Sequence, residues 1–239
     1  MHASKNILIL ANSIRAKNRC IAGKELIPTS SGKYTIGSWI RITDPTTPDG
    51  AVADESALCP GHGFPRVFDI LRIPLRAKCG FEEHPEDWWL EPGKKWEFVK
   101  HGNSGMLPQL ADHPTALWNE GNESDSVPAG HVHRMGKKAA TLYLIKAPRQ
   151  WTFTYWKEWN QVAGKDTKRR RLSFKFAGTD HDFSVTDPIF TLRYRVYDKI
   201  TDQPQTLIVP RPEDAYFCLS LTKEMNRRHY KICATILEA

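Results

Sequence analysis

Short runs of alternating hydrophobic and polar residues dominate the chain, and few segments show the i, i+3, i+4 spacing of an amphipathic helix. The first run, residues 7–11, is entirely apolar and predicts a buried strand. The polar and basic residues that follow, up to Lys24, predict a turn at the rim of a sheet. In residues 39–42 the period of two places Trp39 and Arg41 on one face of a further strand. The pattern predicts an all-β fold with minor helix.

The second half of the chain shows the same alternation. Residues 191–197 predict a strand with Arg193 and Arg195 on one face. Residues 164–171 are so rich in Lys and Arg that we predict a basic turn there. Short strands in this number are typical of small barrels, which remove exposed sheet edges by closing. The other predicted strands of this half are residues 141–145, 151–159, 172–176, 183–186, 216–221 and 230–237.

Residues 101–138 differ in composition from the rest, because Gly, Asn, Pro, Ser, Asp and His prevail there. A loop of this length is uncommon inside a compact domain, so we expect it to connect two domains. The sequence thus predicts two small β-barrels in tandem, at 1–100 and 139–239, joined by an irregular segment at 101–138. Thr-Asp-Pro occurs at 43–45 and again at 186–188, which hints at a repeated domain.

The charge balance and the cysteines bear on partners and compartment. Lys and Arg number 34 against 27 Asp and Glu, a formal net charge of +7. This excess favours a polyanion such as nucleic acid. Five scattered cysteines form no disulfide framework and fit a reducing cytosol. The N-terminal apolar run is too short for a signal peptide or a membrane span, so we predict a soluble cytoplasmic protein with no membrane partner.

Several short motifs follow one another along nearly the whole chain. They are ILILANS at 7–13, RCIAG at 19–23, GSWIR at 37–41, HPED at 84–87, VTDP at 185–188 and YKICAT at 230–235. Their order resembles one protein family, the bacterial dual OB-fold (DuOB) domain family. The resemblance implies two OB-like barrels and, by analogy with OB-folds in general, nucleic-acid binding. It also implies a link to bacterial anti-phage defence, and it carries over no catalytic residue.

OB barrels bind single strands with a basic groove and aromatic side chains on which bases stack. Three tryptophans lie beside cations, and residues 168–171 are four adjacent cations. The alternatives are a barrel core for each tryptophan and a solvated hairpin tip for the basic run. The predicted nucleic-acid-binding residues are Arg15, Arg19, Lys24, Trp39, Arg41, Trp156, Trp159, Lys168, Arg169, Arg170, Arg171, Arg193 and Arg195.

Metal and catalytic signals are weak. Cys59 and His62 form C-x2-H, and Cys79 and His84 form C-x4-H, both within the range of zinc-ligand spacings. A hydrophobic strand separates the two pairs, so we predict no metal site. The sequence contains no nucleophile elbow, Walker loop, dinucleotide fingerprint or His-Glu-x-x-His motif. We therefore predict a non-enzymatic protein without catalytic residues or a cofactor.

These observations predict a protein that binds single-stranded or structured RNA or DNA on basic and aromatic barrel faces, with a partner protein as a further expectation. The alternative is a sensor that binds a nucleotide or another small anion and signals to a partner protein. Arg19 and Lys24 at the predicted rim, together with the long segment at 101–138, motivate this second hypothesis.

Overall fold

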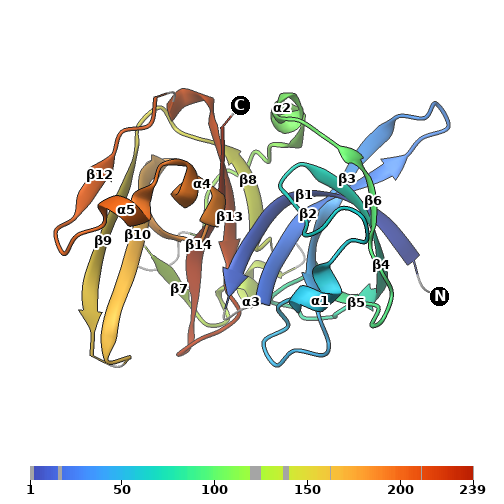
Figure 1. Ribbon diagram of the computed structural model, residues 1–239, viewed down its shortest axis with the longest axis horizontal. Coiled ribbons are helices and arrows are strands. Elements are labelled where there is room, and N and C mark those ends of the chain that lie inside the picture. The colour runs from blue at the N-terminus through green and yellow to red at the C-terminus, as the bar shows by residue number, and fades with distance from the viewer. Residues whose placement is uncertain are drawn as a thin grey trace. The chain divides into compact units, whose positions relative to one another are not determined.

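The computed structural model describes residues 3–15, 18–118, 125–136, 140–161, 163–210 and 212–238. The chain forms two compact units and enters each of them twice (Figure 1). Unit 1 comprises Met1–Leu110 and Val132–Leu142, and unit 2 comprises Ala111–His131 and Tyr143–Ala239. The segment expected to be an irregular connection contains η1 (Ser104–Met106), α2 (Leu107–Leu110), β7 (Ser126–Pro128) and α3 (His131–Met135).

Unit 1 contains a closed five-stranded barrel, in which each strand pairs with the next in the order β1-β2-β3-β5-β4 and β4 pairs back with β1. β3 and β5 are parallel, and the other pairs of the barrel are antiparallel. A sixth strand, β6, extends the sheet beside β4. The elements are β1 (Ala3–Arg15), β2 (Asn18–Pro28), β3 (Tyr34–Thr43), α1 (Asp54–Ala57), β4 (Asp69–Lys78), β5 (Asp87–Leu90) and β6 (Glu97–His101).

The apolar run of β1, residues 7–11, contains the residues at which this barrel closes. Ile7 and Leu8 each pair with β2 and with β4, so one continuous strand reaches both neighbours. β2 crosses β1 so closely that a Cβ atom on Gly23 would lie 2.0 Å from the carbonyl oxygen of Leu8. Only glycine fits at that crossing. The motif at 19–23 therefore has a structural role at its last residue.

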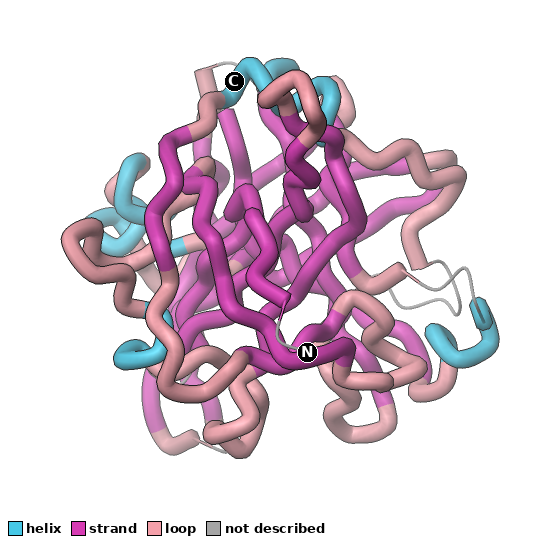
Figure 2. Tube along the Cα trace, turned by 90° about the vertical axis from the view of Figure 1, so that its right-hand side faces the viewer, coloured by secondary structure: helices cyan, strands magenta, loops and turns pink. Residues whose placement is uncertain are grey.

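Unit 2 repeats this strand order with β9-β10-β11-β14-β13, and β11 and β14 are its parallel pair. β12 flanks β9, β8 flanks β13, and β7 pairs with β14. Strands make up most of the described chain and the helices are short, as the sequence predicted (Figure 2). The elements are β8 (Leu142–Lys146), β9 (Trp151–Asn160), β10 (Lys165–Phe176), β11 (Thr179–Val185), α4 (Pro188–Arg193), α5 (Val196–Lys199), β12 (Gln205–Leu207), η3 (Pro212–Asp214), β13 (Ala215–Leu221) and β14 (Arg228–Glu238).

Two sequence-based predictions in unit 2 are wrong. Residues 191–197 form parts of the helices α4 and α5 instead of a strand. Asp187 caps α4 through its side chain and Pro188 occupies the first turn, which together start a helix where alternation predicted a strand. Likewise, residues 165–171 belong to β10 instead of a turn, because they pair with the outer half of β9.

Both Thr-Asp-Pro motifs lie at the same position of their barrels, directly after the third strand. The carboxylate of Asp44 accepts hydrogen bonds from the main-chain N–H groups of Thr46 and Ala53. Asp187 accepts them from Ile189 and Phe190 at the start of α4. Each Asp therefore shapes the segment that leaves the barrel after its third strand. Within the described parts of the chain, no helix combines the length and the apolar character needed to cross a membrane.

Candidate nucleic-acid interface

The β9–β10 hairpin carries most of the predicted binding residues of unit 2. Residues directly opposite each other in an antiparallel pair lie on the same face. The register pairs Trp159 with Asp166, Lys157 with Lys168, and Tyr155 with Arg170. Tyr155 is buried in the barrel core, whereas Trp159 is 63% exposed. This face therefore runs from the core out to solvent.

Tyr197 from α5 joins this face. The ammonium of Lys168 lies 4.3 Å from the centroid of the Tyr197 ring, and the Arg170 guanidinium lies 5.6 Å from it. Arg170 Nη1 also donates a 2.8 Å hydrogen bond to the Tyr197 hydroxyl. Tyr197 itself is 38% exposed. We call the five residues Lys157, Trp159, Lys168, Arg170 and Tyr197 the basic–aromatic face.

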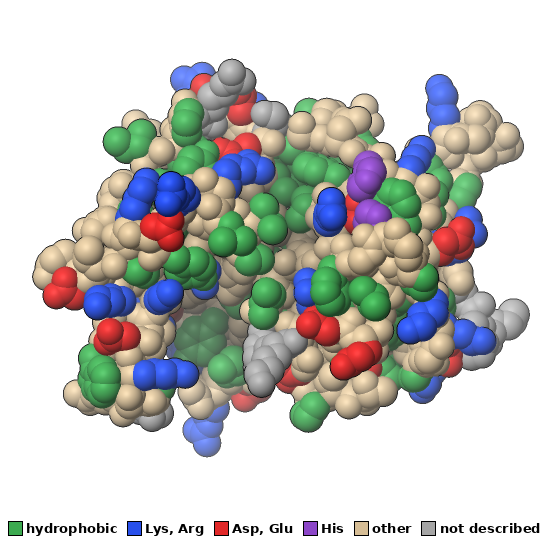
Figure 3. Space-filling view, in the orientation of Figure 1, with side chains coloured by type: hydrophobic (Ala, Val, Ile, Leu, Met, Phe, Trp, Pro, Cys, Tyr) green, Lys and Arg blue, Asp and Glu red, His purple; other side chains and the backbone are tan. Residues whose placement is uncertain are grey.

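The cations of the basic–aromatic face are poorly neutralised. In the described part of the chain, no Asp or Glu forms an ion pair with Lys168 or Arg170. Lys157 lies 3.7 Å from a carboxylate oxygen of Asp166, and both side chains are exposed, so this pair is weak. Figure 3 shows Lys and Arg side chains interspersed with hydrophobic and acidic ones over this part of unit 2. Such a surface suits an anionic ligand that also stacks on rings.

The opposite face of the hairpin is neutralised by its own acids. Glu158 accepts a hydrogen bond of 3.0 Å from the Trp156 indole and one of 2.7 Å from Arg169 Nε. These two bonds, the Trp156 bond first, lower the pKa of Glu158. Arg171 Nη2 donates a 2.7 Å hydrogen bond to a carboxylate oxygen of Asp182. The four cations at 168–171 thus divide between two faces with different chemistry.

Arg193 and Arg195 lie in the helical region and do not join the basic–aromatic face. Arg193 pairs with Glu238, which also accepts a hydrogen bond from the Tyr194 hydroxyl. Arg195 Nε lies 2.8 Å from a carboxylate oxygen of Asp198. Because these residues are not on a strand, the common face that the sequence predicted for them is absent.

The predicted residues of β1, β2 and β3 are mostly engaged within unit 1. The side chain of Arg15 lies outside what the structure describes. Arg19 Nε donates a 2.7 Å hydrogen bond to Asp54, and its guanidinium lies 3.8 Å from the Phe64 ring centroid. Lys24 and Trp39 are both buried, with the ammonium 5.4 Å from the ring centroid. This Trp39 ring is therefore a core side chain and is not exposed for base stacking.

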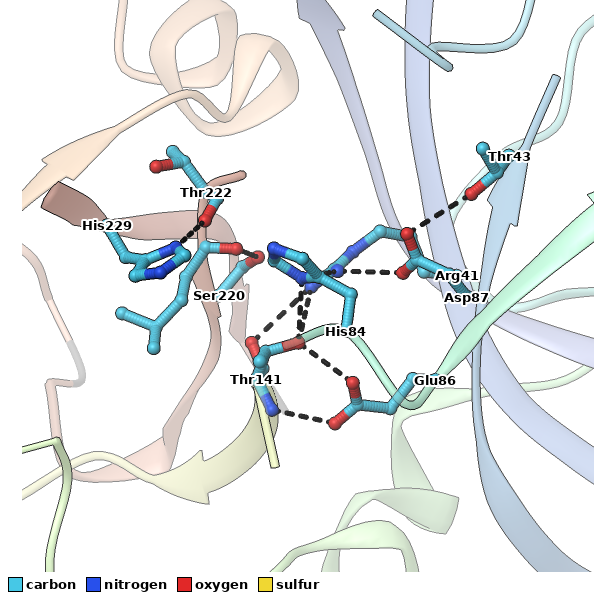
Figure 4. A network of polar contacts seen from close by, with 10 residues as sticks. Arg41, Thr43, His84, Glu86, Asp87, Thr141, Ser220, Thr222 and His229 are labelled. Atoms are coloured by element: carbon cyan, nitrogen blue, oxygen red, sulfur yellow. Dashed lines mark hydrogen bonds and ion pairs between the residues drawn. The ribbon is translucent and has the colours of Figure 1, made fainter. Parts of the chain in front are cut away.

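Arg41 belongs to a buried polar network of unit 1 (Figure 4). Its Nη1 lies 2.9 Å from a carboxylate oxygen of Asp87 and 2.7 Å from His84 Nδ1, and its Nη2 donates a 3.0 Å bond to the Thr141 hydroxyl. The carboxylate of Glu86 accepts both the Thr141 amide, at 2.7 Å, and the Thr141 hydroxyl, at 2.8 Å. The His-Pro-Glu-Asp motif thus binds residue 141 to the barrel of residues 3–110.

The Cys and His residues with zinc-like spacing make separate contacts and do not come together at one site. The Cys59 thiol donates to the carbonyl oxygen of Trp96, and His62 contacts Asp69. His84 lies in the Arg41 network. Among the residues that the structure describes, no three His, Cys, Asp or Glu side chains are placed to hold a metal ion.

The closed barrel of unit 1 and the sheet of unit 2 share one strand order, each with a parallel pair between its third and fifth strands, and together they define a tandem OB-fold protein. The chain belongs to the dual OB-containing domain family, whose model matches residues 5–236. The resemblance drawn from the sequence motifs is thereby confirmed. No curated protein matches the chain.

Two residues of the basic–aromatic face, Lys157 and Tyr197, are not among the binding residues that the sequence predicted. Tyr197 is the last residue of the segment wrongly predicted as a strand, and its place beside β10 depends on the turn between α4 and α5. Arg195 in that turn has a left-handed backbone conformation, with φ of 51°. No local pattern in the sequence signals this turn, because Arg has no preference for that conformation.

Proposed function

We propose that the protein binds single-stranded nucleic acid on the basic–aromatic face of unit 2. The observation that carries this proposal is the pair Lys168 and Arg170, which lie beside Tyr197 and form no ion pair with a described carboxylate. Membership of an OB-containing family supports it, because OB barrels are a common nucleic-acid-binding fold.

Each part of the face has a physical role. Lys168 and Arg170 contact phosphates and release condensed counterions, which makes binding salt-dependent. The exposed indole of Trp159 accepts an unpaired base by stacking, a contact worth about 1–3 kcal/mol. Bases in a regular duplex are already stacked and paired, so single strands and loops are the favoured ligands.

Fluorescence anisotropy with labelled RNA and DNA oligonucleotides at two salt concentrations tests the proposal. We expect binding at low salt that weakens at high salt, with single strands favoured over duplexes. The variant Lys168→Gln/Arg170→Gln should bind at least 10-fold more weakly. The matched control, Lys165→Gln/Arg169→Gln, removes the same charge from the opposite face of the same strand and should bind almost as well as the natural chain. Equal losses in both variants would contradict the assignment of the face.

The biological setting implied by the family resemblance is bacterial anti-phage defence, and we carry it as part of the proposal. Phage plating on a bacterial host that expresses the chain provides the test. We expect fewer plaques with the natural chain than with Lys168→Gln/Arg170→Gln, and equal plaque numbers would remove the defence role while leaving the binding proposal standing. Co-purification from the same cells tests the expected partner protein.

The alternative, a nucleotide sensor, was motivated by Arg19 and Lys24 and by the long segment at 101–138. Arg19 pairs with Asp54, and Lys24 is buried, so neither offers an open cationic rim. A thermal-shift screen still separates the two hypotheses. A nucleotide that raises the melting temperature while oligonucleotides do not would favour the sensor.

A further inference from the structure

Two histidines of unit 1, the unit that does not carry the basic–aromatic face, share one buried carboxylate. Asp69, at the start of β4, is fully buried. His62 Nε2 lies 2.6 Å from one of its carboxylate oxygens, and His101 Nδ1 lies 2.8 Å from the other. The main-chain N–H of Arg66 donates a 2.8 Å hydrogen bond to the oxygen that contacts His62. A buried carboxylate needs such partners because it has lost its hydration.

Aromatic packing fixes the two imidazoles. The His62 ring stacks on Phe98, with centroids 4.0 Å apart and planes 9° apart. The His101 ring lies 4.7 Å from the same Phe98 centroid and 5.6 Å from the His62 centroid. Figure 3 shows histidine side chains gathered on the surface of unit 1 over β6. The three rings and Asp69 therefore form one cluster at the surface.

Each imidazole keeps its second nitrogen available. In the described residues, neither His62 Nδ1 nor His101 Nε2 has a hydrogen-bond partner. The His101 side chain is 61% exposed and that of His62 is 12% exposed. His62 is hydrogen-bonded to a carboxylate through one nitrogen and is open at the other, which is the arrangement of a general base or, once protonated, a general acid. His101 lies within ion-pair distance of the same carboxylate and is the more exposed of the two rings.

The residues around His62 and His101 limit the reactions that the two imidazoles can catalyse. Within the described chain, no Ser, Thr or Cys side chain hydrogen-bonds to either imidazole, and the nearby Cys59 thiol is buried against Trp96. A nucleophile would therefore come from the substrate or from water. RNA carries its own nucleophile, the 2′-hydroxyl next to each phosphodiester, and needs one proton acceptor and one proton donor for strand cleavage.

We propose that His62 and His101 are an acid–base pair that cleaves RNA by transesterification. The neutral imidazole takes the proton of a 2′-hydroxyl as that oxygen bonds to phosphorus. The P–O5′ bond breaks, and the protonated imidazole gives its proton to the leaving O5′. The products are a 2′,3′-cyclic phosphate and a 5′-hydroxyl, and no oxidant, reductant or co-reactant is required. Asp69 is the positioning residue: it hydrogen-bonds to His62 and lies within ion-pair distance, 2.8 Å, of His101 Nδ1.

This inference goes beyond the proposed binding function and shares only its ligand. It departs from the non-enzymatic protein that the sequence predicted. That prediction rested on the absence of contiguous motifs, whereas His62, Asp69 and His101 come from a loop and two strands and form no motif in the sequence.

The test is cleavage of a single-stranded RNA oligonucleotide in the presence of EDTA, with products assayed for the 2′,3′-cyclic phosphate. His101→Gln should lower the rate about 100-fold or more, in the range of a lost general acid or base. His133→Gln is the matched control, because His133 is an equally exposed histidine of unit 1 that pairs with Glu82. An oligonucleotide with 2′-deoxyribose throughout should not be cleaved.

Three further measurements complete the test. The natural chain should show a bell-shaped pH dependence, and Asp69→Asn should alter this profile if the carboxylate positions the rings. His62→Gln should also lose activity while keeping its circular-dichroism spectrum. Absence of the cyclic phosphate, or equal cleavage by His101→Gln, overturns the inference. RNA that is bound without being cleaved overturns it while leaving the proposed function intact, and absence of binding in the anisotropy assay rejects the proposed function separately.

Discussion

The two units share a strand order, but among the described strands only the sheet of unit 1 has a pair that closes it. In unit 1 the single strand β1 pairs with both β2 and β4. In unit 2 the corresponding stretch is split into β8 and β9, and each half has its own partner, β13 for β8 and β10 for β9. Pro148 lies between the halves, where it cannot donate to a ladder. The first strand is thus continuous in unit 1, whereas in unit 2 it is interrupted at Pro148.

The barrels also differ in how they use charge. In unit 1, Arg19 pairs with Asp54 and Arg41 with Asp87. In unit 2, Lys168 and Arg170 have no carboxylate partner within the described residues. These two pairs of cations therefore have different surroundings on one shared strand order, as expected when function depends on individual sites instead of on the fold.

The largest expected effect comes from breaking the Arg41 network. Arg41→Leu leaves the buried Asp87 carboxylate without its cation, which typically costs about 3–5 kcal/mol. We expect the free energy of unfolding to fall by that amount in chemical denaturation followed by tryptophan fluorescence. Lys168→Leu, at an exposed cation of unit 2, is the control and should change it little. A loss below 1 kcal/mol in Arg41→Leu would show that the network is not structural.

In unit 2, His181 should make stability depend on pH. Burial, and secondarily the charge of Lys231, lowers the pKa of His181 to about 4 from an ordinary 6.5. The fold keeps His181 neutral. The stability that the neutral side chain contributes is therefore fully present above pH 6.5 and is lost as the pH falls toward 4. The loss reaches about 3 kcal/mol. His181→Phe, beside Phe174 and Phe183, should remove this part of the pH dependence. Denaturation curves at several pH values check the difference.

Trp159→Ala removes the proposed stacking ring from the exposed end of β9. We expect the affinity for single strands to fall about 10-fold, since stacking contributes about 1–3 kcal/mol per base. Trp156→Ala is the control, because Trp156 lies on the opposite face and bonds Glu158. Anisotropy titrations of both variants decide whether the two faces differ.

The smallest expected difference between the two units concerns the Asp residues of the two Thr-Asp-Pro motifs, Asp44 and Asp187. Burial favours a higher pKa for Asp44, but hydrogen bonds from Thr46 and Ala53 outweigh it and lower the pKa. Burial raises the pKa of Asp187 despite its hydrogen bonds. The stability contributed by Asp44 is therefore present above pH 3.8 and lost below it, whereas that of Asp187 is lost as pH rises. At neutral pH, Asp44→Asn should cost about 1–2 kcal/mol and Asp187→Asn less. Equal costs in thermal unfolding would contradict this contrast.

Much of the fold could be predicted from alternation, because a half-buried strand shows its period of two directly. The prediction failed at residues 165–171, where a strand extends beyond the core and carries charge on both faces, so no apolar residue marks it. It failed at 191–197, where a capping Asp and a following Pro started a helix. The candidate site could not be predicted without the register of β9 and β10. This register decides that Arg170, and not Arg169, faces Tyr197.

The central claim is that Lys168 and Arg170 bind phosphates, and the salt dependence of single-strand binding tests it most directly. Each phosphate contact on a single strand contributes a slope of about −0.7 to log K against log salt. For Lys168→Gln/Arg170→Gln we predict a slope shallower by about 1.4 than that of the natural chain, with Lys165→Gln/Arg169→Gln unchanged. A slope unaltered in the first variant would contradict the account.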